Sequence, residues 1–227
     1  MTDDEQASNA TQNSSAKSAA KFITIEGIEG TGKSTVINVV AHWLTEQGMP
    51  FIQTREPGGT LVAEQIRELF LKKQMETMCF DTELLLVFAA RAQHLNHVIY
   101  PALKEGKSVI CDRFTDASYA YQGGGRGMSQ ERIACLEQWV QGTFRPDKVI
   151  LLDAPVDICL QRTMMRGALD RIELEQEAFF ERARAVYLDR AKHNPTQYKI
   201  VDAARTLPEV SGQIREILAS IYGDKSC

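Results

Sequence analysis

Short runs of mostly β-branched hydrophobic residues alternate along the chain with longer segments of helical pattern. Several runs lack the inside–outside alternation of a half-exposed strand, which is typical of parallel strands covered on both faces. The intervening segments, such as 34–47 and 82–105, are long enough for crossover helices. The pattern therefore predicts an α/β fold, a doubly wound parallel five-stranded sheet flanked by helices, with strands at 22–26, 51–54, 108–112, 148–153 and 198–202.

One domain is expected over residues 21–222. Residues 1–20 are polar and rich in Ser, Ala and Asn, without the apolar segment of a secretory signal, and predict a disordered tail. Residues 223–227 are assigned to a C-terminal tail. The longest apolar run, 84–90, is too short to span a bilayer. Five scattered cysteines without a C-x-x-C pair favour reduced thiols, so we expect a cytoplasmic protein without a membrane partner.

Composition limits the class of partner. With 44% hydrophobic and 25% charged residues in a 227-residue chain, usage is that of an ordinary globular domain. The formal net charge of −4 gives no broad basic surface, so a nucleic-acid partner is not expected. Small phosphorylated ligands need only a local cluster of positive charge.

Directly after the first predicted strand, the sequence GIEGTGKS (27–34) fits the phosphate-loop pattern G-x-x-x-x-G-K-[ST]. Its glycines let backbone N–H groups surround a phosphate at the N-terminus of the next helix. Lys33 is expected to reach the β- and γ-phosphates of ATP, and the Ser34 hydroxyl to bind Mg²⁺. The alternative is a glycine-rich turn with a surface lysine. The predicted ATP-binding residues are Gly27, Ile28, Glu29, Gly30, Thr31, Gly32, Lys33, Ser34 and Thr35.

An acid and an arginine stand together where the third predicted strand ends. In a doubly wound sheet Asp112 would lie near the phosphate loop, where it can hold a water bound to Mg²⁺. Arg113 could bridge two phosphates through its planar guanidinium. An Asp-Arg pair by itself is common and more often structural.

Further motifs join this pair in a fixed order: EGIEGTGKS (26–34), TREPGGT (54–60), DRF (112–114), YQGGGRG (121–127) and LDRIE (169–173). Their order and spacing resemble those of the bacterial thymidylate kinases, a family of P-loop nucleoside monophosphate kinases, over all of the chain but the tail. The resemblance implies phosphoryl transfer from MgATP to dTMP, giving dTDP and ADP in dTTP biosynthesis. It also implies a homodimer.

The resemblance implies how dTMP would be bound. Glu29 would meet the deoxyribose 3′-hydroxyl, and Arg67 with Arg113 would hold the monophosphate. Arg91 would bond O4 of thymine, and an aromatic residue would stack on the base. The family's usual spacing, Phe-x-x-x-Arg, puts Val87 in the aromatic's place, whereas here the phenylalanine is Phe88, so either residue could face the base. The expected acceptor residues are Glu29, Glu56, Arg67, Phe88, Arg91, Arg113, Ser118, Tyr121, Gln122 and Tyr187.

Two of these residues would select the acceptor. Ser118 would read the thymine edge, with Gln122 a weaker candidate for the same pocket. Tyr121 would pack against C2′ of the sugar and exclude a ribose hydroxyl. Tyr187, on a later helix, would approach the acceptor nucleotide.

A basic segment at about 162–174 would form a mobile lid. One type of thymidylate kinase carries its catalytic arginine in the phosphate loop, where this chain has Gly30, so the resemblance implies an arginine from the lid. Arg166 is the first choice and Arg171 the second. The loop 203–205 would touch adenine. The predicted catalytic residues are Lys33, Asp112, Arg113, Arg166 and Arg171, and the predicted Mg²⁺ ligands are Ser34 and Asp112.

Two other functions remain open on the sequence. The chain could be another P-loop kinase, for a deoxynucleoside or a different nucleotide, which a panel of acceptors would reveal. It could also be a non-catalytic regulator that binds a nucleoside triphosphate, which would release no ADP in response to an acceptor.

Overall fold

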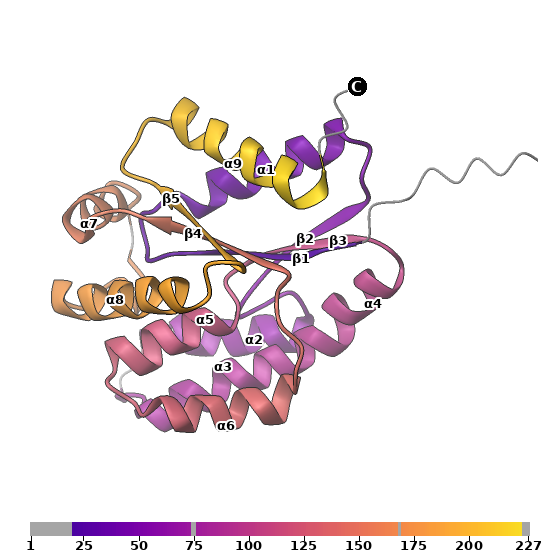
Figure 1. The fold of residues 1–227 in the computed structure, drawn as a ribbon. Coiled ribbons are helices and arrows are strands. Elements are labelled where there is room, and N and C mark those ends of the chain that lie inside the picture. The colour runs from indigo at the N-terminus through magenta and orange to yellow at the C-terminus, as the bar shows by residue number, and fades with distance from the viewer. Residues whose placement is uncertain (1–19, 74–75, 168, 224–227) are drawn as a thin grey trace, which may run out of the picture.

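A parallel sheet of five strands in the order β2-β3-β1-β4-β5 lies at the centre of the molecule (Figure 1). The structure, a computed structural model, describes residues 20–73, 76–167 and 169–223. All four strand pairings are parallel, and this arrangement confirms the predicted doubly wound α/β fold. Apart from residues 20 and 223, the two predicted tails lie outside the described residues.

The strands form where the hydrophobic runs predicted them. Four match the predicted bounds, and β2 is one residue longer because Arg55 pairs with Asp112 and the next amide, that of Glu56, donates to the Asp112 carbonyl at 2.9 Å. Every residue of β1 is buried, as expected of a central strand covered on both faces. The strands are β1 (Phe22–Glu26), β2 (Phe51–Arg55), β3 (Ser108–Asp112), β4 (Lys148–Asp153) and β5 (Tyr198–Asp202).

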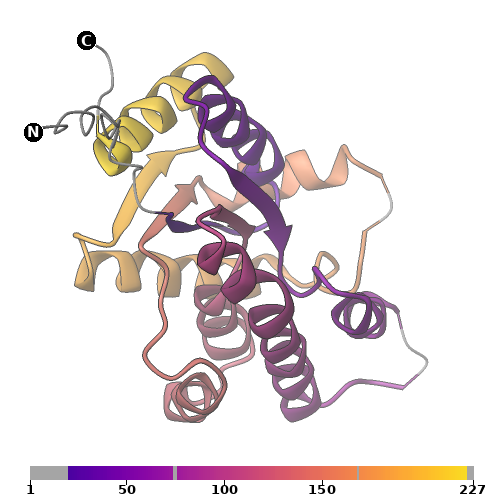
Figure 2. The ribbon, with the colours of Figure 1, turned by 90° about the vertical axis from the view of Figure 1, so that its right-hand side faces the viewer.

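Helices cover both faces of the sheet. Figure 1 shows α1 (Lys33–Glu46) and α9 (Leu207–Tyr222) together on one face. On the other face lie α3 (Phe80–His94), α4 (Tyr100–Lys104), α5 (Thr115–Ser118), α6 (Gln130–Gln141) and α8 (Glu177–His193). In the view of Figure 2, α2 (Leu61–Leu71) and α7 (Val156–Met164) project toward the same side, and the chain that follows α7 returns toward α2.

The segment 82–105, predicted to be helical, consists of three parts. A π-helical turn, η1 (Leu95–Ile99), separates α3 from α4, and Pro101 stands in the first turn of α4. A proline inside a helix cannot donate a hydrogen bond, and its ring crowds the carbonyl four residues earlier. The wider π turn immediately before Pro101 accommodates that ring. A second π-helical turn, η2 (Tyr119–Gly125), follows α5.

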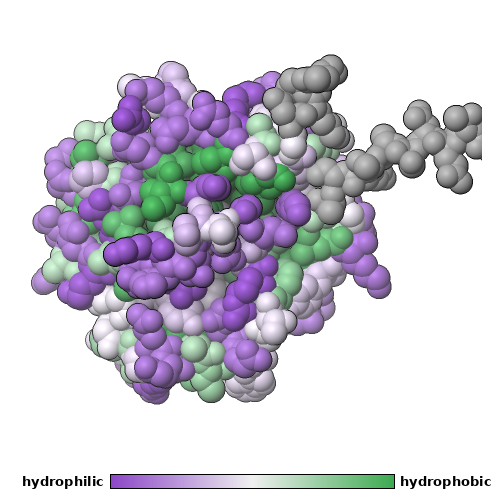
Figure 3. Space-filling model, in the orientation of Figure 1, coloured by the Kyte–Doolittle hydropathy of each residue, from purple (hydrophilic) through white to green (hydrophobic). Residues whose placement is uncertain are grey.

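The surface is predominantly polar on the face drawn in Figure 3, with a band of hydrophobic residues below α9 along the edge strand β5. Ile200 on that strand is half-exposed. Among the described residues, no helix has both the length and the apolar composition to cross a membrane.

The carboxyl ends of β1, β2 and β3 lie side by side because these strands are neighbours in one parallel sheet. The phosphate loop follows β1, TREPGGT follows β2 and DRF follows β3. Three of the motifs found in the sequence are therefore brought to one edge, where ligands of such sheets bind.

Candidate active site

The phosphate loop between β1 and α1 contains glycines whose backbone conformation disfavours a side chain. Gly27, Gly30 and Gly32 have φ angles of 138°, 77° and 88°, which favour glycine. A Cβ on Gly30 would lie 2.0 Å from the carbonyl oxygen of Cys159 on α7. An arginine at position 30 is therefore excluded by the packing of α7 against the loop, as well as by the backbone angle.

Lys33 opens α1 with its amine turned back into the loop. Nζ donates to the carbonyls of Gly27 and Ile28, both at 2.9 Å. Burial, aided by the nearby charge of Arg113, lowers the pKa of Lys33 to about 8. Thr31 is buried and donates to the Ile28 carbonyl, whereas Ser34 and Thr35 are exposed.

A cavity over the loop, here called the phosphate cavity, joins the loop to the end of β3 and to the segment 162–174 that is predicted to form a lid. Asp112 and Ser34 both line it, and Oδ1 of Asp112 is buried without a hydrogen-bond partner among the described residues. An unpaired buried carboxylate oxygen in the same cavity as the exposed Ser34 hydroxyl suits a hard cation such as Mg²⁺. No group of three or more His, Cys, Asp or Glu residues in the described chain could hold a metal alone. Mg²⁺ at nucleotide sites commonly takes most of its ligands from phosphates and water.

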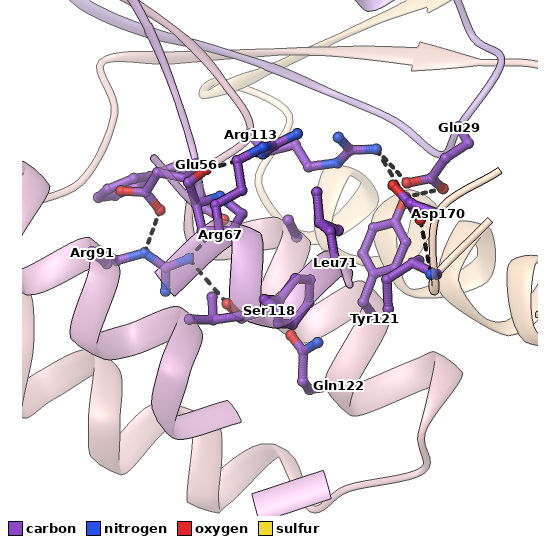
Figure 4. Close-up of a pocket in the computed structure, with 16 residues that line it drawn as sticks. Glu29, Glu56, Arg67, Leu71, Arg91, Arg113, Ser118, Tyr121, Gln122 and Asp170 are labelled. Carbon is purple, nitrogen blue, oxygen red and sulfur yellow. Dashed lines mark hydrogen bonds and ion pairs between the residues drawn. The ribbon is translucent and has the colours of Figure 1, made fainter. Parts of the chain in front are cut away.

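A second pocket adjoins the phosphate cavity and is here called the acceptor pocket (Figure 4). Glu29, Arg67, Arg113 and Asp170 line both, so the two spaces meet at these side chains. Its lining is Glu29, Glu56, Pro57, Arg67, Phe70, Leu71, Val87, Arg91, Arg113, Phe114, Ala117, Ser118, Tyr121, Gln122, Asp170 and Ile172.

Glu29, Arg113 and Tyr121 point toward one another at the junction (Figure 4). Arg113 Nη2 donates to Glu29 Oε1 at 2.7 Å and to the Tyr121 hydroxyl at 3.2 Å, while that hydroxyl donates to Glu29 Oε2 at 2.6 Å. Burial alone would raise the pKa of Glu29, but Arg113 and Lys33 lower it below its usual value. Glu29 is therefore a carboxylate at neutral pH.

The backbone of Arg113 is in the left-handed region, with a φ of 66°, which is uncommon for a residue other than glycine. Two hydrogen bonds from β1 hold this turn. The Arg113 amide donates to the Ile25 carbonyl at 3.0 Å, and the Phe114 amide donates to the buried Glu26 carboxyl at 2.7 Å. The end of β1 thus fixes the direction in which Arg113 leaves β3.

Arg91 lies at the other end of the acceptor pocket and is 1% exposed. Its Nε donates to Glu56 at 2.7 Å, and its Nη2 donates to the Phe114 carbonyl at 3.1 Å and the Ser118 hydroxyl at 3.0 Å. Nη1 is buried and has no partner among the described residues. A buried donor without a partner is costly, so this nitrogen is suited to a ligand oxygen.

Of the two residues considered for the base, Val87 lines the acceptor pocket and Phe88 does not. Phe88 packs with Leu84, Tyr119 and Ile133, and its ring centroid lies 4.6 Å from the guanidinium carbon of Arg91. The aromatic side chain of α2 that does line the pocket is Phe70, which the sequence analysis missed. An aromatic residue at the end of an amphipathic helix gives no signal to distinguish it from core.

The remaining predicted acceptor residues differ in position. Gln122 lines the acceptor pocket and donates to Glu83 at 2.9 Å. Arg67 lies at the junction and donates to the Pro57 carbonyl at 2.9 Å. Tyr187 lines neither space: its ring packs edge-on against Tyr121, and its hydroxyl donates to Glu26 at 2.8 Å.

The lid arginines separate into two groups. Arg162 and Arg166 line the phosphate cavity; Arg162 donates to the Ala203 carbonyl, and Arg166, with 61% of its side chain exposed, pairs with Glu173. Arg171 lines neither space and instead pairs with Glu83 at 2.7 Å. Arg205, in the loop expected near adenine, is exposed and pairs with Asp202 and Glu209.

Comparison with known proteins shows which proteins this chain resembles in sequence and in fold. A model of the thymidylate kinase family matches residues 25–214. The chain is 57% identical over 200 residues to a thymidylate kinase of Pseudomonas syringae pv. tomato, covering 88% of the chain and 95% of that protein. A thymidylate kinase of Pseudomonas putida is also 57% identical, with 88% and 97% covered. A crystal structure of thymidylate kinase from Ehrlichia chaffeensis superposes with a TM-score of 0.71 at 30% identity, covering 89% of this chain and 98% of that one.

Proposed function

Because this chain belongs to the thymidylate kinase family, we propose that the phosphate cavity holds ATP and the acceptor pocket holds dTMP, with their phosphates meeting at Arg113. The reaction is phosphoryl transfer from ATP to dTMP, giving ADP and dTDP, a step in dTTP biosynthesis. The observation that supports this placement of the substrates is the junction. Arg67 and Arg113 line both spaces, so two guanidiniums stand where an acceptor phosphate would face the donor.

On the donor side, the glycine amides and Lys33 would hold the phosphates of ATP. Ser34 and the unpaired oxygen of Asp112 would hold Mg²⁺. When bound, Mg²⁺ neutralises charge on the donor phosphates. We propose that the loop 203–205 lies near adenine.

On the acceptor side, Arg67 and Arg113 would bind the monophosphate, and the ionised Glu29 would accept a hydrogen bond from the 3′-hydroxyl. Nη1 of Arg91 would donate to a thymine oxygen, with Ser118 and Gln122 beside the base edge. Tyr121, fixed by Glu29 and Arg113, would pack against C2′ and disfavour a ribose. Glu56 and Phe88 would serve by holding Arg91, and Tyr187 by supporting Tyr121.

The chemistry needs no general base, because the acceptor phosphate is itself a nucleophilic dianion near neutral pH. Catalysis is then positioning and the neutralisation of charge on the transferred group. Lys33 and Arg113 supply positive charge from the sheet side, and Arg166 supplies it from the lid. The lid also reduces the access of water, the rival acceptor.

Further proposals concern assembly and location. Exposed apolar side chains on α2, α3 and α6 support a homodimer: Leu61, Leu69, Phe80, Leu85 and Trp139. A cytoplasmic location is proposed from the scattered cysteines of the sequence.

The function is tested by the initial rate of ADP release with MgATP and each of dTMP, dUMP, UMP, CMP and AMP. We expect kcat/KM to be highest for dTMP. A higher value for another acceptor, or ADP release that does not depend on the acceptor, would contradict the proposal.

A further inference from the structure

Glu83 is a fully buried carboxylate that the proposed chemistry does not use. It lies in the first turn of α3 and lines neither the phosphate cavity nor the acceptor pocket. Four donated hydrogen bonds reach it: one from Gln122 at 2.9 Å, two from Arg126 at 3.2 Å each and one from Arg171 at 2.7 Å. Burial of a charge is costly unless hydrogen-bond donors compensate it, so the contribution of Glu83 lies in the groups that it holds together.

Arg171 ties the lid to the end of α2 as well as to Glu83. Its backbone amide donates to the Leu71 carbonyl at 3.2 Å, and its Nε donates to the Phe70 carbonyl at 2.8 Å. Its guanidinium carbon lies 5.0 Å from the centroid of the Phe70 ring. The side chain is therefore engaged on the side of α2 and α3, away from the phosphate loop.

The partners of this pair form the wall of the acceptor pocket. Phe70 and Gln122 line the pocket, and so do Asp170 and Ile172, the two chain neighbours of Arg171. Side chains from α2, from η2 and from the lid thus meet through one carboxylate and one guanidinium. Without Glu83, Arg171 would still join the lid to α2, but the link from Arg171 through this carboxylate to Gln122 on η2 would be lost.

The charges around Glu83 are balanced. Arg126 also pairs with Glu175 at 2.5 Å, so two carboxylates face two guanidiniums. Burial would raise the pKa of Glu83, but Arg126, Gln122 and Arg171 lower it below its usual value. The carboxylate is therefore ionised across the neutral range in which a kinase is assayed.

We propose that Glu83 is a positioning residue for the acceptor nucleotide, and that Arg171 holds the lid wall of the acceptor pocket on Glu83 and Phe70. This inference rests on the proposed function, in which the pocket takes dTMP. It gives Arg171 a role different from that of a phosphate-binding arginine, which the sequence suggested as second choice to Arg166.

The test compares Glu83→Gln, Arg171→Lys and the double variant with the unaltered enzyme. Steady-state kcat, the KM for dTMP and the KM for MgATP are measured for each. We expect each single change to raise the dTMP KM about tenfold, the effect of losing one charge-assisted hydrogen bond. The kcat at saturation should stay within about threefold, since the transferred group is not touched. Both groups act through their shared contact. The dTMP KM of the double variant should therefore be at most about twofold above that of the more impaired single variant.

Arg215→Lys is the matched control, because Arg215 pairs with Glu46 at 2.9 Å on the opposite face of the sheet. It should leave all three parameters unchanged. A kcat that falls tenfold or more in Arg171→Lys at an unchanged dTMP KM would overturn the proposal and place Arg171 on the transferred phosphoryl group. A lower melting temperature with an unchanged dTMP KM, in either single variant, would overturn it too. If Glu83→Gln does not fold, Arg171→Lys alone decides. Failure of the unaltered enzyme to phosphorylate dTMP would instead contradict the proposed function.

Discussion

Glu26 shows how a single buried residue can support the site without lining it. It ends β1 with no exposed surface, and its carboxyl accepts hydrogen bonds from the Phe114 amide and the Tyr187 hydroxyl. One bond fixes the turn that directs Arg113, and the other holds the tyrosine that packs against Tyr121. Burial, with a contribution from Asp116, raises the pKa of Glu26 from 4.5 to about 8.

This raised pKa predicts a pH dependence of stability. Between about pH 4.5 and pH 8 the carboxyl is ionised in the unfolded chain but protonated in the folded one, so the free energy of unfolding falls as pH rises. Glu26→Gln keeps a neutral side chain of the same shape. The free energy of unfolding of both proteins is measured with urea at pH 5.5, 7.0 and 8.5. The value for the variant minus that for the unaltered protein should increase by at least ~1 kcal/mol from the lowest to the highest pH. Parallel curves for the two proteins would contradict the prediction.

At the scale of elements, the glycines of YQGGGRG are needed for packing. The first five residues of the motif, 121–125, belong to the π-helical turn η2, which lies against α8. A Cβ on Gly124 would lie 2.7 Å from the backbone oxygen of Arg182 on α8. Because Tyr121 and Gln122 belong to the same turn, the close approach of η2 to α8 also sets the position of two side chains that line the acceptor pocket.

Gly124→Ala should therefore destabilise the protein by about 1–3 kcal/mol, since backbone atoms must move apart. Gly212→Ala is the matched control: Gly212 lies within α9, and an added Cβ there would meet no atom within 4 Å apart from the adjacent backbone of its own helix. That change should be neutral or stabilising by up to ~1 kcal/mol, because alanine is the better helix former. Equal effects of the two substitutions in urea unfolding would show that backbone entropy, and not the contact with α8, decides.

The backbone elements could be predicted from the sequence, whereas the side-chain orientations that complete the site could not. Strands and the phosphate loop follow from local pattern, because short runs of β-branched hydrophobic residues and the spacing of glycines determine backbone geometry directly. The orientation of α3 about its own axis depends on tertiary packing. Val87 and Phe88 are neighbours in sequence, and packing against Leu84 and Tyr119 turns Phe88 away from the pocket. The direction of Arg171 depends on Glu83, a residue 88 positions away in sequence. No local signal contains such a contact, so Glu83 and Phe70 were missed.

In the whole molecule, the positive charges of the phosphate cavity come from parts of the chain that are far apart in sequence. Lys33 follows β1, Arg113 follows β3, and Arg166 reaches the cavity from the lid. The packing of α7 against Gly30 prevents the phosphate loop from carrying an arginine at position 30. The same α7 leads into the lid that brings Arg166. Helix α7 thus excludes an arginine from position 30 and also leads into the segment that carries Arg166.

Arg166→Ala should accordingly lower kcat by about 10²–10³-fold, the usual cost of removing one group that stabilises transition-state charge. The dTMP KM should change less, because Arg166 does not line the acceptor pocket. Stability should be little altered, since the side chain is largely exposed and its pair with Glu173 is a surface pair. Arg215→Ala, which removes a comparable surface pair on the far face, should leave kcat unchanged. If Arg166→Ala raised only the KM for dTMP, the arginine would bind the acceptor, and the charge on the transferred group would have to be met from the sheet side alone.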